Sequence, residues 1–193
     1  MTDEEIIKQI LQGNRDAYRF LVEKHQSMIF RTCMGFLHDK DETEDLTQEV
    51  FIQAFQSLQK FKGSSSFSTW LYRIAVNASL NKIRKAKKSS LFQRLGFFHG
   101  NDQMKTFDIP IPENEIPENA FLLDEQKQMV QSALNSLPEN QRTAIVLSKY
   151  DDLSQKEIAF IMNTSEGAVE ALIQRAKANL REKLLSLSKK SIK

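Results

Sequence analysis

The chain has 193 residues, a formal net charge of +2 and 40% hydrophobic residues, a size that allows one domain or two small ones. Its single cysteine, Cys33, has apolar neighbours and is expected in the core. One cysteine cannot form an intramolecular disulfide, and its being the only one favours a reducing compartment. No apolar run approaches the roughly 18 residues that span a bilayer, and the acidic first residues differ from a signal peptide, so we expect a cytoplasmic protein without membrane insertion.

Charge is strongly segregated along the sequence. Residues 1–50 carry 6 basic and 11 acidic residues, residues 51–100 carry 9 basic and no acidic ones, and residues 101–193 carry 12 and 14. The acid-free block is also rich in aromatic residues. Cations neutralise phosphates and aromatic rings stack on unpaired bases, so this block fits single-stranded nucleic acid, with a solvated basic surface over an aromatic core as the alternative. The segregation predicts one surface for a polyanion and another for a different partner.

Helical periodicity dominates the chain. Apolar residues recur at spacings of three and four, glycine and proline are scarce, and strand-like alternation does not persist, so we predict an all-α protein. The pattern predicts a short helix ending at Gly13, then helices over about 15–37, 42–60, 66–88, 121–135, 139–150, 155–162 and 166–187. Asn14 is a candidate cap for the second of these helices.

The segment 89–120 departs from this periodicity. It contains Pro110, Pro112 and Pro117, and prolines remove backbone donors and end helices. We therefore predict a flexible linker that joins two small helical domains, residues 1–88 and 121–193.

The helix expected over 42–60 has two contrasting faces. At 100° per residue, the apolar face expected in the core carries Leu46, Val50, Ala54, Leu58 and Phe61, and the opposite face carries Asp45, Gln48, Glu49, Ile52 and Gln56. An isoleucine among acids and amides is typical of a protein-binding patch, with a merely solvated face as an equal alternative. An acidic metal site is less favoured, because the helix dipole already explains acids near the N-terminus.

The helix expected over 66–88 carries a polar stripe opposite its core face. Ser66 or Ser68 can cap it, and the core face holds Phe67, Leu71, Ile74, Ala75 and Ala78. The stripe consists of Trp70, Arg73, Asn77, Asn81, Arg84 and Lys88. Asparagine amides can donate to and accept from base edges, while arginine and lysine hold phosphates. A structural stripe would include acids for pairing, so we predict a nucleic-acid surface. The loop 62–66 either wraps an extruded base or is an ordinary surface loop.

The C-terminal part of the chain predicts a helix-turn-helix. Ser154 and Glu157 form a capping box that starts one helix, and residues 163–165 break the pattern before a longer helix begins. Residues 166–193 carry 7 basic and 3 acidic residues. Two helices joined by a short turn, the second one basic, place a recognition helix in the major groove, whereas an ordinary helical hairpin is the alternative.

Motifs along both domains resemble one protein family. The strings DLTQEVF at 45–51, FKG at 61–63 and FSTWLYRIAVN at 67–77 resemble the N-terminal domain of extracytoplasmic-function (ECF) sigma factors of bacterial RNA polymerase. The strings LPE at 137–139, LS at 153–154, EIA at 157–159, GAV at 167–169 and RAK at 175–177 resemble the C-terminal domain of that family. The resemblance covers nearly the whole chain outside the expected linker.

The resemblance implies a set of roles for residues of this chain. Core polymerase would be bound by Asp45, Gln48, Glu49, Phe51, Ile52 and Phe55. The minus-ten promoter element would be melted and its non-template strand read by Lys62, Ser64, Ser65, Phe67, Trp70, Arg73, Asn77, Asn81, Arg84, Lys85 and Lys88. The minus-thirty-five element would be bound by Ser165, Glu166, Glu170, Ala171, Gln174, Arg175 and Lys177. RNA polymerase core enzyme, promoter DNA and an anti-sigma factor are the implied partners.

One position departs from the family pattern. Many relatives continue the recognition helix with basic and small polar residues, whereas Glu170, Ala171 and Leu172 follow Val169 here. A carboxylate can accept from a cytosine amine and repels phosphate, so Glu170 is a candidate selectivity residue.

Two other classes of protein remain as alternatives. A stand-alone helix-turn-helix regulator would need a dimerisation surface, and the sequence shows no coiled-coil heptad. An enzyme is disfavoured, because the three histidines lack metal-ligand spacing and no phosphate-cradling glycine loop occurs, although a nuclease built from the acids near Asp41 is not excluded. We expect no catalytic residue, no metal and no cofactor.

Overall fold

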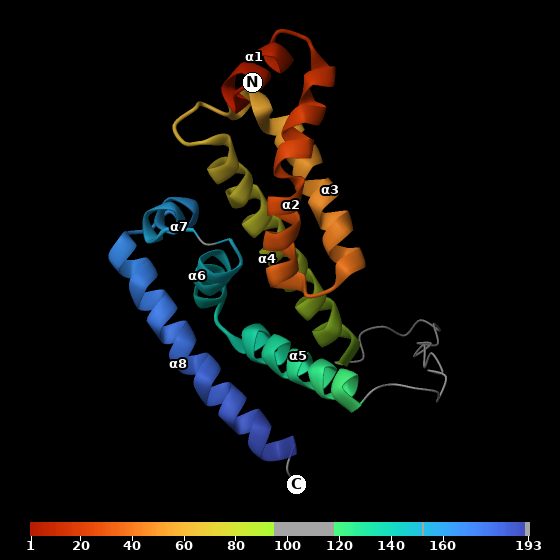
Figure 1. Ribbon diagram of the computed structural model, residues 1–193, viewed down its shortest axis with the longest axis vertical. Helices are drawn as coiled ribbons and strands as arrows, with labels where there is room; N and C mark the ends of the chain where they lie inside the picture. The colour runs from red at the N-terminus through yellow and green to blue at the C-terminus, as the bar shows by residue number, and fades with distance from the viewer. Residues whose placement is uncertain (95–117, 152, 192–193) are drawn as a thin grey trace.

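The computed structural model describes residues 1–94, 118–151 and 153–191 (Figure 1). Its helices are α1 (Asp3–Leu11), α2 (Tyr18–Leu37), α3 (Lys40–Ser57), α4 (Phe67–Arg94), α5 (Glu118–Ser136), α6 (Glu139–Tyr150), α7 (Gln155–Met162) and α8 (Glu166–Ser191), with short 3-10 turns at Arg15–Ala17 and Leu58–Lys60. Those three ranges contain no strand, and the prediction of an all-α protein with two small helical domains is confirmed.

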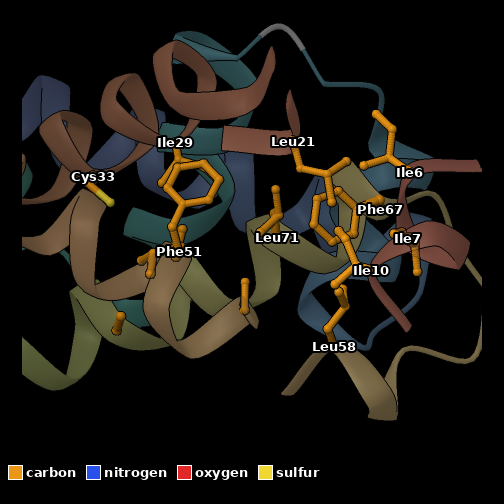
Figure 2. Packing of buried hydrophobic residues seen from close by; sticks show 14 of the residues in the cluster. Ile6, Ile7, Ile10, Leu21, Ile29, Cys33, Phe51, Leu58, Phe67 and Leu71 are labelled. Carbon is orange, nitrogen blue, oxygen red and sulfur yellow. The ribbon is translucent and has the colours of Figure 1, made fainter. Parts of the chain in front are cut away.

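The first domain consists of α1 to α4 around one apolar core. Helix α2 packs against both α3 and α4. Figure 2 shows Phe67 at the start of α4 among side chains of α1 and Leu21, while Phe51 of α3 lies next to Ile29 of α2. Cys33 is fully buried in the same cluster, as predicted, and burial raises the pKa of its thiol to about 11.

Local capping explains where several helices begin. The Ser66 hydroxyl accepts a hydrogen bond from the Thr69 N–H at 3.1 Å and caps α4, and the predicted capping box of Ser154 and Glu157 starts α7. Helix α3 begins earlier than predicted, because Asp39 accepts from the Glu42 N–H at 2.8 Å. The cap predicted at Asn14 is wrong: its side chain makes no cap hydrogen bond, and a 3-10 turn precedes α2.

Helices also extend farther than predicted. Helix α4 continues to Arg94, since residues 89–94 contain neither glycine nor proline. Helix α5 begins at Glu118 and α8 reaches Ser191. Both ends of the segment 89–120, predicted as linker, are therefore helical, and its remaining residues lie outside the described ranges.

The second domain is the predicted four-helix unit with a helix-turn-helix. Its core holds Leu147, Ile158, Val169 and Ala176, all without solvent exposure. Asn163 ends α7 in the left-handed conformation with φ of 52°, which turns the chain sharply before α8. The ends of α6 and α7 match the predicted ranges.

The two domains pack against each other, which the sequence did not predict. Helix α6 contacts α2, and α7 contacts α4 (Figure 1). Phe36, Tyr72, Val76 and Leu80 of the first domain are buried in the apolar cluster of the second. A third face of α4, distinct from its core face and its polar stripe, thus forms a domain contact.

Candidate protein and nucleic-acid interfaces

A groove of about 860 Å³ runs between α2 and α3. It is lined by Arg15, Asp16, Tyr18, Arg19, Val22, Gln26, Thr47, Gln48, Phe51, Ile52, Phe55 and Gln56. Ile52 and Phe55 are 57% and 37% exposed there. The Tyr18 ring packs edge-on against Phe55, and its hydroxyl donates to the Phe51 carbonyl at 2.7 Å. The groove is therefore an apolar surface held in shape by contacts between α2 and α3.

The predicted contact face of α3 overlaps this groove only in part. Asp45, Gln48, Glu49 and Ile52 are exposed. Of the predicted core face, Leu46, Val50, Ala54 and Leu58 are buried, while Phe61 lies beyond α3 and is partly buried. Phe51 differs: its side chain is 6% exposed and belongs to the core cluster. The groove has a second wall, formed by side chains of α2, which the sequence did not predict. These α2 residues belong to no recognisable motif, and only their helical phase marks them as facing outward.

Three aromatic residues fix the loop that precedes α4. The centroids of Phe61 and Trp70 lie 5.3 Å apart, and those of Phe67 and Trp70 lie 5.6 Å apart. Phe67 is only 2% exposed, so its ring is a core element and cannot stack on a base in this conformation. The Ser64 side chain is exposed, and Gly63 takes a positive φ of 68° that favours glycine. The loop thus exposes polar side chains and is supported by the three packed aromatic rings.

Most of the polar stripe of α4 faces solvent. Its members Arg73, Asn77, Asn81, Arg84 and Lys88 are exposed, as are Lys85 beside it and Lys62 of the loop, whereas Trp70 is partly buried against the core. Arg73 and Asn77 make no hydrogen bond or ion pair with the residues that the structure describes. An arginine that can bind phosphate and an asparagine that can bind base edges are therefore both unpaired among the described residues, one helical turn apart.

Arg84 is already paired. Its Nε donates to both carboxylate oxygens of Glu139 at 2.9 and 3.1 Å, and its Nη1 donates to Asn81 Oδ1 at 3.2 Å. The hydrogen bond from Arg84 lowers the pKa of the Glu139 carboxyl group. The acid missing from the α4 stripe is thus supplied by the first residue of α6, in the other domain.

The N-terminal half of α8 presents the predicted recognition surface. The Ser165 hydroxyl accepts from the Ala168 N–H at 3.2 Å and caps the helix. Val169, Ile173 and Ala176 are buried. The outward residues Glu166, Glu170, Ala171, Gln174, Arg175 and Lys177 are all exposed. Local phasing therefore brings the predicted residues onto one solvent-facing surface.

The described residues provide neither a metal-binding cluster nor a membrane span. Within these ranges, no group of three or more His, Cys, Asp or Glu side chains could hold a metal ion, and no helix is long and apolar enough to cross a membrane. Several acids at the start of α3 have local partners: Asp39 caps the helix, Glu44 pairs with Lys40 at 3.7 Å, and Glu42 pairs with Lys82 at 3.9 Å.

Comparisons with known proteins identify the family. The Sigma-70 region 2 profile matches residues 21–89, and the Sigma-70 region 4 profile matches residues 127–180. The chain is 34% identical to the ECF RNA polymerase sigma factor SigW of Bacillus subtilis, over 94% of this chain and 96% of that protein. This chain belongs to the ECF family of RNA polymerase sigma factors. The sigma factor directs RNA polymerase to promoters. It is also 36% identical to RNA polymerase sigma-H factor of Pseudomonas aeruginosa, over 91% of this chain and 90% of that protein.

Solved structures share the fold of this sigma factor. CnrH in complex with the cytosolic domain of CnrY matches with a TM-score of 0.64 and 26% identity, over 95% of this chain and 97% of the other. RpoE of Bartonella quintana, solved with the anti-sigma factor NepR, matches with a TM-score of 0.59 and 22% identity, over 86% and 96%. These likenesses support the fold, while the roles of individual residues stay predictions.

Proposed function

We propose that this sigma factor binds core RNA polymerase through the α2–α3 groove, reads the non-template strand of the minus-ten element with α4, and grips the minus-thirty-five element with α8. The observation that carries the proposal is the exposed part of the α4 stripe, in which Asn77 and Asn81 lie between Arg73 on one side and Arg84 and Lys88 on the other. Cations bind phosphates without regard to sequence, and amides read base edges, so the stripe combines affinity with selectivity.

The groove between α2 and α3 is the proposed polymerase site. Ile52 and Phe55 expose apolar surface beside Gln48, within an otherwise acidic and amide face. Apolar and aromatic side chains at the centre of a polar rim are typical of energetic anchors in protein interfaces. The acids Asp45 and Glu49 lie outside the groove lining and would form its polar rim.

The loop and the start of α4 are the proposed site of strand opening. Lys62, Ser64 and Ser65 lead into the helix, where Trp70 is partly buried against Phe61 and Phe67. Because Phe67 is in the core, we assign it to support of the loop, and we assign base reading to Asn77 and Asn81. Arg73, Arg84, Lys85 and Lys88 would hold phosphates of the same strand.

On α8, Arg175 and Lys177 would contact phosphates, and Glu166, Glu170, Ala171 and Gln174 would face the groove of duplex DNA. A glutamate accepts from the cytosine N4 amine, which favours a cytosine opposite Glu170.

We assign this protein no catalytic step, cofactor or metal, and place its action in the cytoplasm. An anti-sigma factor is a proposed partner, supported by the structural likeness to CnrH, which was solved bound to the cytosolic domain of CnrY.

Reconstituted transcription tests the proposal. Purified core polymerase with this protein should start RNA at defined promoters from which core enzyme alone does not start. A stand-alone regulator would instead bind duplex promoter tightly without core enzyme and block transcription. That second result would refute the proposal.

A further inference from the structure

A shared carboxylate joins α1 to α2. Asp3, in the first turn of α1, accepts a hydrogen bond from Lys24 Nζ at 2.6 Å through Oδ1, and its Oδ2 lies 2.9 Å from His25 Nε2. Burial of the Asp3 carboxyl group works against its ionisation, but the hydrogen bond from Lys24 and the neighbouring His25 outweigh this effect, so the pKa of Asp3 is lowered. An ionised carboxylate only accepts hydrogen bonds, so Nε2 is the nitrogen of His25 that donates.

The ring of His25 is buried against Phe67, the first residue of α4. His25 is 7% exposed, and the two ring centroids lie 5.6 Å apart with their planes at 64°. An edge-on contact depends on the orientation of both rings, because the edge of an aromatic ring is positive and its face negative. The hydrogen bond to Asp3 is directional as well. Asp3 therefore fixes the orientation in which His25 meets Phe67.

The apolar packing of α1 does not require this polar pair. Ile6, Ile7 and Ile10 are 2%, 6% and 7% exposed and lie near Phe67 (Figure 2). Apolar burial has no preferred direction, so these residues hold α1 on the core without selecting an orientation for the His25 ring. Replacing a buried polar pair by well-packed apolar residues is often neutral or stabilising. The pair is therefore explained by the orientation that it imposes, rather than by stability.

Phe67 in turn closes the loop 62–66 at its base. Phe61 directly precedes the loop and Phe67 directly follows it, and their ring centroids lie 5.8 Å apart with the planes at 86°. Within the loop, Lys62, Ser64 and Ser66 are exposed. The two rings bring the ends of the loop together, so the placement of its exposed polar groups depends on where Phe67 is held.

We infer that His25 is a positioning residue for the loop 62–66: Asp3 orients the His25 ring, the ring holds Phe67, and Phe67 keeps the loop in a shape that receives an unpaired base. The inference rests on the proposed role of this loop in strand opening. A loop already held in its binding conformation loses little conformational entropy when the base enters, so the contact raises affinity for that base. Asp3, His25 and Phe67 lie outside the described lining of the α2–α3 groove, so polymerase binding should not depend on them.

The first test follows the fluorescence of Trp70. It is the only tryptophan in the chain and packs on Phe67, so its emission reports on the base of the loop. Acrylamide should quench this emission more strongly in Asp3→Ala, which loses the hydrogen bond, and in His25→Gln, which keeps a donor for Asp3 and loses the ring. Lys24→Ala removes the other partner of the same carboxylate and should be quenched as the wild type is. Wild-type quenching in either Asp3→Ala or His25→Gln overturns the inference.

The second test measures how firmly the loop holds a base. The full-length protein is bound to single-stranded minus-ten oligonucleotides that each carry one abasic nucleotide. At the position facing the loop, the missing base should weaken binding of the wild type severalfold and should weaken binding of Asp3→Ala much less. A variant that is only less stable would lose affinity equally for intact and abasic strands. Glu4→Ala removes an exposed acid from the same turn of α1 and should respond as the wild type does.

The affinity of Asp3→Ala for core polymerase shows whether its effect is confined to the loop. It should equal that of the wild type, and a parallel loss of polymerase affinity would indicate a general effect on the fold and overturn the inference. Full wild-type sensitivity to the abasic position in Asp3→Ala overturns it as well, while the proposed function stands. If no abasic position weakens binding of the wild type, and Asn77→Ala binds the intact strand as the wild type does, the proposed function fails and the inference fails with it.

Discussion

Arg142 is a buried charge with a structural purpose. It is 2% exposed, and its Nε and Nη2 donate to the carbonyls of Leu134 and Asn135 at 3.0 and 2.6 Å. These carbonyls belong to the last turn of α5, where helices lack internal donors and favour cations. Burial lowers the pKa of the guanidinium, and its charge is retained because arginine titrates far above neutral pH. Arg142 therefore fixes the corner between α5 and α6.

Removing Arg142 should destabilise the second domain. Arg142→Ala leaves two carbonyls of α5 without their charged donor, and we expect a loss of about 2–3 kcal/mol in the free energy of unfolding. Urea unfolding followed by circular dichroism measures it. Lys149→Ala is the control, because Lys149 is exposed on the same helix. Equal losses for the two variants would show that Arg142 does not fix the corner.

At the scale of elements, α3 has one face in the core and another in the proposed polymerase contact. The exposed Ile52 contributes little to folding, so a charge placed there should act on binding alone. Ile52→Glu should weaken the affinity for core polymerase about tenfold or more, which corresponds to ~1.4 kcal/mol. Gln53→Glu adds the same charge to a neighbouring exposed position outside the groove and should bind as the wild type does. Competition binding with labelled protein measures both affinities, and similar losses in both would argue against the groove.

Helix α4 shows how much of an element the sequence predicts. Its core face and polar stripe follow from phase alone, and most of their residues are buried and exposed as predicted, except that Ile74 of the core face and Trp70 of the stripe are both partly buried. Tyr72, Val76, Leu80 and Ile83 form a further apolar line, visible in the sequence at spacings of four, four and three. Their partner was not predictable, because a periodic pattern specifies which side chains avoid water and not which distant helix covers them. The pairing of Arg84 with Glu139 was missed for the same reason.

At the scale of the molecule, sequence motifs identified two domains and assigned a partner to each surface. They left the relation between the domains undetermined, since it depends on a few long-range contacts such as that of Thr32 with Asp151. The structure adds that α6 contacts α2 and α7 contacts α4, while the groove between α2 and α3 is lined only by residues of the first domain.

Promoter selection with reconstituted polymerase tests the central claim, that α4 reads the minus-ten strand, most directly. Asn77 is exposed and unpaired among the described residues, so Asn77→Ala should change base preference at minus-ten positions while leaving minus-thirty-five preference unchanged. Glu170→Ala should do the reverse and serves as the internal control. Sequencing the transcripts from a randomised promoter library gives both preferences at once. An unchanged minus-ten preference in Asn77→Ala would contradict the reading of the strand by this stripe.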